Sequence, residues 1–192
     1  MIRAVIFDLF GTLIANYGRE HYLEVIENMG RAVDAPPDAF RDLWRKHYVD
    51  RLTGVHKTES DNIRWVCDQL GVHPNDAQVA ASNEIYLEFA RPFLMNARDS
   101  SKDVLREIQT AAIKTGLISD CGPWVPDNWA SSPFAGLIDF PVYSSRCGAK
   151  KPENPCMRKL LPGWAYNLKI VSTSPTETVR NYPLQKLLAW EP

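Results

Sequence analysis

The sequence has no long apolar run and no excess of charge of either sign. No hydrophobic segment approaches the roughly 20 residues that a membrane-spanning helix needs, and Lys plus Arg total 22 against 23 Asp plus Glu. The net charge of −1 argues against a surface built to bind nucleic acid. The apolar stretch near the start is interrupted by Asp8 and lacks a cleavage site of small residues, so we expect neither a signal peptide nor a membrane partner.

Cysteine pairs and metal-binding histidine motifs are also missing. The cysteines lie far apart without a CxxC pair, which is typical of free thiols in a reducing cytoplasm. The histidines lack the spacing of motifs such as HExxH, so we expect surface side chains rather than metal ligands. What remains is a cytoplasmic protein of 192 residues, 45% of them hydrophobic, which is long enough to bury a core. The residues concerned are Cys67, Cys121, Cys147 and Cys156, and His21, His47, His56 and His73.

Another absence is confined to the end of the chain. Residues 140–192 contain no aspartate, and from about Glu153 onward prolines interrupt nearly every candidate helix or strand. One short apolar segment there, around residues 168–171, has the composition of a strand.

The first part of the chain has the pattern of alternating strands and helices. Residues 4–7 are apolar and precede Asp8 and a Gly-Thr pair, which is the pattern of a buried strand ending in a turn. Residues 116–119 and 140–143 have the same character. Strand, helix and strand in this order are typical of a parallel, doubly wound sheet.

Between the first two strands, apolar residues recur at three- and four-residue steps for about eighty residues. Four helical segments are expected. The first is expected to end or loosen at Gly30 and the second to end at Gly54. The third begins near Thr58 or Ser60, and the fourth follows Asn75. A crossover between parallel strands needs only one helix, so these segments predict an inserted helical cap.

We therefore expect an α/β protein with a Rossmann-like three-layer core, a parallel sheet and an inserted cap. The core comprises residues 1–14 and 95–192, and the helical cap comprises residues 15–94. In such sheets ligands bind at the carboxyl ends of the strands.

Three polar residues closely follow candidate strands: Asp8, Ser119 and Lys151. The Asp before Gly11 and Thr12 is either a carboxylate that caps a turn or a nucleophile whose anionic substrate is held by N–H groups of the same loop. Ser119 alone could simply end a strand, and Lys151 alone could be a surface charge. Their order, each after a strand, favours a shared site.

These segments resemble the motifs of the haloacid dehalogenase-like (HAD) hydrolases. Residues 7–13, FDLFGTL, are similar to the first motif, residues 116–120 to the second and residues 148–152 to the third. The helical segment at 15–94 takes the place of that superfamily's helical cap. The resemblance covers residues 1 to about 152.

The resemblance implies specific roles for several residues. Asp8 would be a nucleophile that forms an aspartyl-enzyme intermediate, Ser119 would bind the substrate anion, and Lys151 would neutralise charge on Asp8. The substrate would be a small anionic molecule enclosed by the cap. Residues implied to contact it are Phe10, Gly11, Thr12, Asp120 and Arg45.

Phe10 departs from the phosphatase branch of this family, which has a second Asp at that position. A phenyl ring cannot protonate a leaving group, and such proton transfer is worth ~10²–10⁴ in rate. The dehalogenase branch has an aromatic residue there, because halide leaves without a proton. Residues 43–45, Leu-Trp-Arg, also resemble the cap segment whose Arg receives halide, although the pattern favours Arg45 as an exposed helix residue beside Leu43 and Trp44 of the core.

Asp120 occupies the position at which dehalogenases usually have Asn. The sequence therefore does not decide between the dehalogenase and phosphatase branches of the family. A 2-haloacid dehalogenase, a phosphatase-like hydrolase and an inactive truncated product are the alternatives.

The family's fourth motif, a strand ending in acidic residues that hold Mg²⁺ in phosphatases, is not recognisable after Lys151. Only Glu153, Glu177 and Glu191 follow, and none belongs to an adjacent acidic pair. Mg²⁺ prefers six carboxylate and water oxygens, so Asp8 without acidic partners is an incomplete site.

One hypothesis for the missing motif is a shifted reading frame. The shifted codons opposite residues 175–179 permit Asp-Gly-Asp-Ser without requiring a stop, and the nucleotide sequence of the gene tests this. Such a chain would have an open sheet edge and marginal stability.

Overall fold

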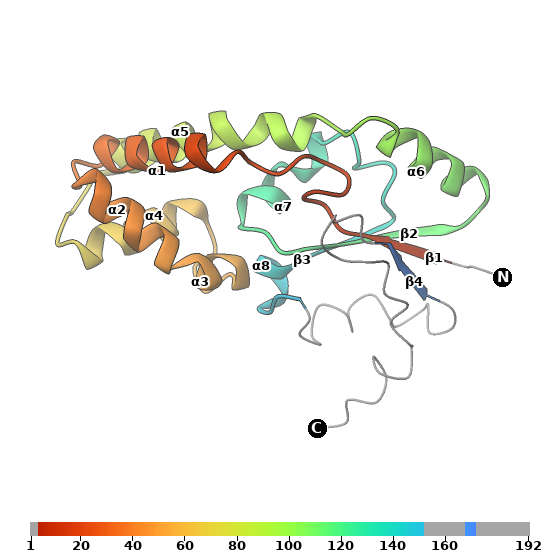
Figure 1. Cartoon of the computed structure of the whole chain (residues 1–192). Coiled ribbons are helices and arrows are strands. Elements are labelled where there is room, and N and C mark those ends of the chain that lie inside the picture. Colours follow the sequence, from red (N-terminus) through yellow and green to blue (C-terminus); the bar gives the residue numbers. More distant parts are fainter. Residues whose placement is uncertain (1–3, 152–167, 172–192) are drawn as a thin grey trace, which may run out of the picture.

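The structure is a computed structural model that describes residues 4–151 and 168–171. Within these residues a parallel sheet holds four strands in the order β3-β2-β1-β4 (Figure 1). The alternation of strands and helices therefore correctly predicts an α/β, Rossmann-like fold with a parallel sheet. The strands are β1 (Ala4–Phe7), β2 (Lys114–Ser119), β3 (Phe140–Tyr143) and β4 (Leu168–Val171).

The central position of β1 explains its unbroken apolar sequence. All four of its residues are buried, and it pairs with β2 on one side and β4 on the other. Strands covered on both faces read as continuous hydrophobic runs rather than alternating ones. Ile6 and Ile118 pack on one face with Val142, whereas Phe7 and Leu117 belong to the larger hydrophobic cluster.

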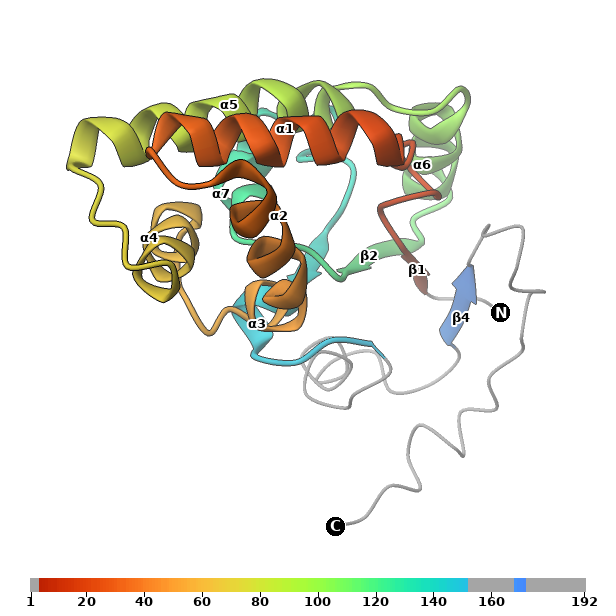
Figure 2. The same ribbon diagram turned by 60° about the vertical axis from the view of Figure 1, so that its left-hand side comes forward.

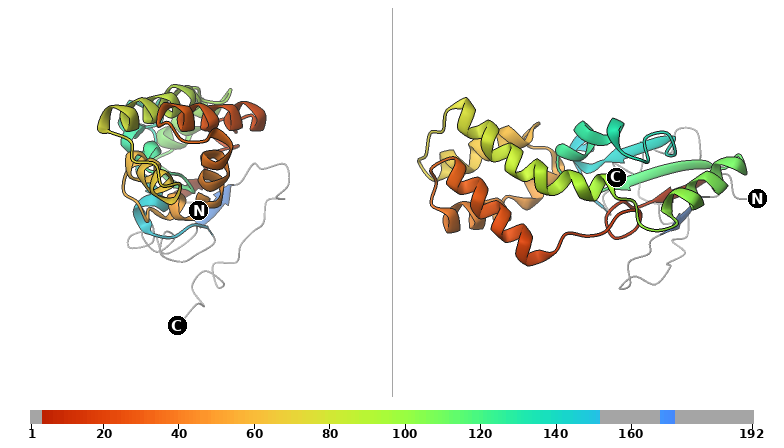
Figure 3. Two further views of the ribbon diagram at one scale, coloured as in Figure 1. Left: turned by 90° about the vertical axis from the view of Figure 1, so that its left-hand side faces the viewer. Right: turned by 90° about the horizontal axis from the view of Figure 1, so that it is seen from above.

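Five helices lie between β1 and the helix that leads into β2. They occupy one end of the molecule, beside the carboxyl ends of the strands (Figure 3). Helices α1 and α5 run side by side, and α2 crosses below them (Figure 2). The bounds are α1 (Arg19–Ala32), α2 (Pro37–Lys46), α3 (Tyr48–Thr53), α4 (Glu59–Gln69) and α5 (Asp76–Met95), with α6 (Ser101–Thr110) preceding β2.

The second expected helical segment consists of two helices, α2 and α3, because the helix is interrupted at His47. The expectation of a surface histidine is wrong for His47, which is buried because its imidazole stacks on Trp65 of α4 with ring centroids 3.9 Å apart. This contact between separate helices holds the junction of α2 and α3, and no local sequence pattern reports it.

The expected helix start near Thr58 is correct and has a specific cause. The Thr58 hydroxyl accepts a hydrogen bond from the N–H of Asp61 at 3.0 Å, and the Asp61 carboxylate accepts one from the N–H of Thr58 at 3.1 Å. This reciprocal capping box satisfies two of the N–H groups that a helix start leaves unpaired. Asn75 and Gln78 form the same arrangement at the start of α5.

Gly30 does not end α1, which continues to Ala32. A Cβ atom at Gly30 would lie 2.9 Å from Cβ of Phe40 in α2. The glycine therefore serves the close approach of α1 and α2 rather than a helix end. Gly54 does end α3, with φ of +65°, and a Cβ there would lie 1.9 Å from the carbonyl oxygen of Ser145.

Three short elements follow the strands at their carboxyl ends: α7 (Trp124–Asn128), the 3₁₀ turn η1 (Trp129–Ser131) and α8 (Ser144–Cys147). The N–H of Cys121 donates to Oγ of Ser144 at 2.9 Å, which ties the loop after β2 to α8. Cys67, Cys121 and Cys147 are free thiols, as expected, and Cys156 lies outside the described residues. In the part of the chain that the structure describes, no helix is long and apolar enough to cross a membrane.

Candidate active site

Asp8 and Lys151 form an ion pair at the carboxyl edge of the sheet. Asp8 directly follows β1, and Lys151 follows α8 after a short turn. Nζ of Lys151 donates to Oδ1 of Asp8 at 2.6 Å, and the two side chains are 36% and 28% exposed. The carboxylate is thus held by a cation yet remains reachable from solvent.

Lys151 is fixed in place by the end of β2. Its backbone N–H donates to Oδ1 of Asp120 at 2.9 Å, and its ammonium lies 3.4 Å from the carbonyl oxygen of Ile118. Asp120 thereby positions the backbone that carries the lysine. The motif residues at 120 and 151, which the sequence could only place after separate strands, are in direct contact.

Ser119 lies between Ile118 and Asp120, the residues that contact Lys151. Its side chain is fully buried, and its Oγ, which lies near the buried thiol of Cys121, makes no regular hydrogen bond among the described residues. Burial of a hydroxyl group without a hydrogen bond costs free energy. The Ser119 hydroxyl is therefore well suited to donate a hydrogen bond to a bound ligand or to accept one from it. No described contact joins Ser119 to Asp8, and its anion-binding role stays a prediction.

The loop after β1 turns sharply back on itself. The carbonyl oxygen of Leu9 accepts hydrogen bonds from the N–H groups of Thr12, Leu13 and Ile14 at 2.9 to 3.2 Å. Gly11 has a φ of +77°, a conformation that side-chain-bearing residues rarely adopt. The substrate contacts expected of Gly11 and Thr12 stay predictions.

Phe10 points into a cluster of aromatic rings. Its ring meets Tyr17 edge-on with centroids 5.5 Å apart, and Trp124 in the same way at 6.4 Å. The position that would carry a second carboxylate in a phosphatase is therefore filled by apolar packing.

A cavity of about 440 Å³ lies between the helices after β1 and the end of β2. Its wall includes Asp120, which accepts a hydrogen bond from the backbone N–H of Lys151, so the cavity lies next to the ion pair, although neither Asp8 nor Lys151 lines it. This volume falls in the range of ligand-binding pockets. The other lining residues are Phe10, Asn16, Tyr17, Tyr22, Arg45, Tyr48, Arg51, Leu52, Tyr86, Cys121, Gly122 and Trp124.

Two arginines line this cavity in different ways. Arg45 is exposed, as the alternative interpretation of the sequence had it, yet it still borders the cavity. Arg51 is 3% exposed, with its guanidinium carbon 4.1 Å from the centroid of the Trp44 ring. Sequence reasoning missed Arg51, although it lies three residues after Tyr48, which is the spacing of neighbours on one helix face. Its other aromatic contact, Trp44, belongs to the preceding helix α2.

Glu59 is a second buried ionisable group near the cavity. Burial raises the pKa of its carboxyl, and the positive charge of Arg51 partly opposes that shift. Asn62 donates to its Oε2 at 3.3 Å. A Cβ atom at Gly122 would lie 2.6 Å from Oε1 of Glu59, so the carboxyl lies directly against the loop after β2.

The described residues do not fit a magnesium site. Residues 4–151 and 168–171 contain no group of three His, Cys, Asp or Glu side chains able to hold a metal. Oδ1 of Asp8 is occupied by Lys151, and Phe10 supplies no oxygen ligand. Glu153, Glu177, Glu191 and the segment concerned by the reading-frame hypothesis lie outside the described residues.

Three features together define the class of protein. They are the parallel sheet in the order β3-β2-β1-β4, the helices inserted after β1, and the Asp–Lys ion pair at the carboxyl edge of the sheet. The chain has the fold of the HAD-like hydrolases. No protein-family model matches this chain.

Comparison with individual proteins agrees with this class. The chain is 24% identical over 128 residues to an (S)-2-haloacid dehalogenase of Pseudomonas putida, a match that covers 62% of this chain and 51% of that protein. It thus spans about half the length of the curated relatives it matches.

Two solved structures share the fold. The first, named as a predicted HAD-like family hydrolase from Porphyromonas gingivalis, has a TM-score of 0.62 at 19% identity, covering 91% of this chain and 83% of that one. The second is a variant of a HAD family enzyme from Bacteroides thetaiotaomicron in complex with magnesium and inorganic phosphate. Its TM-score is 0.63 at 18% identity, and the match covers 97% of this chain and 91% of that one.

Proposed function

We propose that this chain is a HAD-like hydrolase in which Asp8 attacks a small anionic substrate and Lys151 and Ser119 assist. The ion pair between Asp8 and Lys151 carries the proposal. The ammonium group of Lys151 fixes the orientation of the Asp8 carboxylate, which a nucleophile requires. Residues 15–94 would act as a cap that excludes water from the bound substrate.

The favoured reaction is displacement of halide from a 2-haloacid. An oxygen of Asp8 forms a bond to the halogen-bearing carbon while the carbon–halogen bond breaks, and halide leaves with the electron pair. Water then attacks the carbonyl carbon of the ester. This releases the hydroxy acid and restores the Asp8 carboxylate, with one proton of the water on the new hydroxyl group and the other in solvent.

Phe10 supports this branch over phosphate ester hydrolysis. An alkoxide leaving group needs a proton, and proton transfer contributes ~10²–10⁴ in rate, whereas halide needs none. The similarity to an (S)-2-haloacid dehalogenase points the same way. A phosphatase-like role is the second candidate, because a protein of similar fold is known in complex with magnesium and phosphate.

The test measures halide release from 2-haloacids and phosphate release from phosphate monoesters, with and without Mg²⁺. We expect halide release by the wild type and none by Asp8→Asn. Asp103→Asn, which changes an exposed carboxylate on α6, is the matched control and should keep full activity. Activity that survives in Asp8→Asn would refute the nucleophile. Release of neither product by the wild type would favour the inactive alternative.

A further inference from the structure

Arg51 is a buried cation that faces a cavity, and it forms no ion pair with a carboxylate among the residues that the structure describes. It is 3% exposed, it lines the cavity, and its Nε has no hydrogen-bond partner among the described residues. Glu59 acts on it electrostatically, but no ion pair joins the two among the described contacts. A buried charge is costly unless it is paired. A cation in this setting is therefore ready to bind an anion from the cavity.

The contacts that Arg51 does make hold its guanidinium still. The guanidinium carbon lies 4.1 Å from the centroid of the Trp44 ring and 6.0 Å from that of Tyr48. The hydroxyl of Tyr22 lies close enough to act on the guanidinium electrostatically, and it accepts a hydrogen bond from Nε1 of Trp44 at 3.2 Å. Stacking on aromatic faces suits arginine and leaves the edge of its planar group free for a carboxylate.

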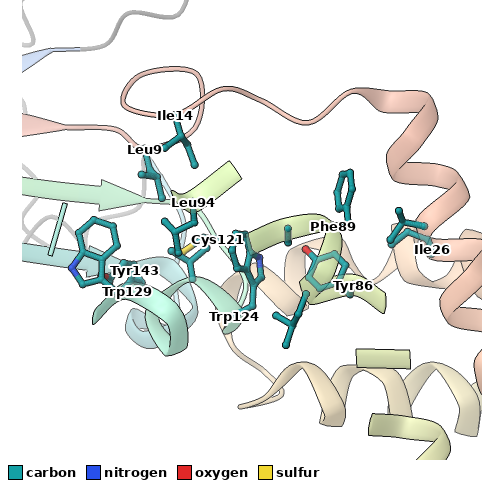
Figure 4. Packing of buried hydrophobic residues seen from close by; sticks show 14 of the residues in the cluster. Leu9, Ile14, Ile26, Tyr86, Phe89, Leu94, Cys121, Trp124, Trp129 and Tyr143 are labelled. Carbon is teal, nitrogen blue, oxygen red and sulfur yellow. The ribbon is translucent and has the colours of Figure 1, made fainter. Parts of the chain in front are cut away.

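The rest of the wall is built from aromatic rings. Tyr86 and Trp124 meet at 88° with centroids 6.3 Å apart, and Figure 4 shows them next to each other between α5 and α7. Phe10, Tyr17 and Tyr22 add further rings to the lining. Such a wall binds flat apolar groups through edge-to-face and stacked contacts.

The size of the cavity also exceeds what a three-carbon haloacid needs. A cavity of about 440 Å³ holds the equivalent of about fifteen water molecules at ~30 Å³ each. A three-carbon haloacid has only six non-hydrogen atoms. The volume leaves room for a substituent as large as a phenyl group.

We propose that Arg51 is the specificity-determining residue of this cavity and binds the carboxylate of a substrate that carries an aromatic ring. The ring lies against Tyr86 and Trp124. Arg45, which is exposed at the cavity wall, contributes little because water screens its charge. This inference rests on the proposed function only in taking the cavity as the substrate site.

The first test needs no variant. The affinity of the wild type for 3-phenylpropionate is compared with that for 3-phenylpropanamide, a neutral compound of the same shape, by tryptophan fluorescence or calorimetry. A charged hydrogen bond to Arg51 should make the acid bind about tenfold tighter or more. Equal affinities would overturn the role of Arg51. Acetate should bind at least about tenfold more weakly than 3-phenylpropionate. Equal affinities of the two acids would overturn the proposal that the substrate carries an aromatic ring.

The second test compares Arg51→Met with Arg45→Met. We expect the Arg51 variant alone to lose about tenfold or more in affinity for the acid while its affinity for the amide stays unchanged. Circular dichroism and thermal melting verify the fold, and Arg51→Lys provides a variant that keeps the charge and should retain part of the preference. Equal losses in the two Met variants would contradict the proposal. Binding should persist in Asp8→Asn, so failure of the catalytic proposal and failure of this one are distinguishable.

Discussion

The ammonium group of Lys151 lies 2.6 Å from Oδ1 of Asp8, although the two residues are 143 positions apart in the sequence. Asp120 holds the backbone of that lysine, so β1, β2 and the segment after α8 meet at one point. An ion pair that is about a third exposed adds little to stability. Its value lies in the orientation of the Asp8 carboxylate.

Removal of the Lys151 charge should therefore affect catalysis far more than folding. We expect Lys151→Met to lower halide release by about 10²-fold or more, because an electrostatic contact to the reacting group is lost. Its unfolding free energy should change by less than about 1 kcal/mol. Lys150→Met is the neighbouring control and should keep its activity. A Lys151→Met protein as active as the wild type would refute the assisting role.

The close approach of α1 and α2 makes Gly30 sensitive to substitution. In Gly30→Ala the new Cβ would lie 2.9 Å from Cβ of Phe40. Overpacking of this kind costs about 1–3 kcal/mol, measured by chemical denaturation. Gly136→Ala places its Cβ in open space and should change stability by no more than about 0.5 kcal/mol. Equal stability of the two variants would show that α1 and α2 can separate without cost.

Gly54 and Gly71 both have a positive φ, but only at Gly54 would an added Cβ also clash with the backbone of another segment. Gly71→Ala, with φ of +69° and open space, should cost about 1–2 kcal/mol for the left-handed conformation. Gly54→Ala adds a Cβ placed 1.9 Å from the Ser145 carbonyl oxygen, so it should destabilise the protein more. The difference in unfolding free energy between the variants measures the contact of α3 with α8. A difference of zero would mean that this contact adjusts freely.

Glu59 should make stability depend on pH. Burial raises the pKa of its carboxyl in the folded state above the ordinary value of about 4.3. Between the ordinary and the raised pKa, the folded protein therefore binds more protons than the unfolded chain. The unfolding free energy therefore falls as pH rises from about 4.3 through the raised pKa.

The measurement compares denaturation across that pH range for Glu59→Gln and the wild type. Glu59→Gln should have a flatter pH dependence, because the amide does not titrate. Glu107→Gln, at an exposed position on α6, should follow the wild type. If Glu59→Gln retained the wild-type slope, another group would have to be responsible.

Much of the fold could be read from local patterns. The apolar segment 140–143 coincides with β3, and the segment at 168–171 coincides with β4. The helix start at Thr58 was also visible, because capping depends on residues only three positions apart. The break at His47 and the continuation of α1 past Gly30 were not visible, since Trp65 and Phe40 on other helices decide them.

The sequence by itself indicated that Asp8 and Lys151 come after strands of a parallel sheet, whose polarity brings strand ends to one edge. Lys151 is separated from β3 by α8, and its contact with Asp120 brings it to that edge. It also determined that Phe10 replaces a possible second carboxylate. Only the tertiary structure decided that Arg51 is buried at the cavity wall while Arg45 stays exposed there, because the sequence places both in one expected helical segment that is in fact α2 and α3. Their difference comes from the packing of Trp44, Tyr22 and Tyr86 around one guanidinium, and that packing joins helices that are distant in the sequence.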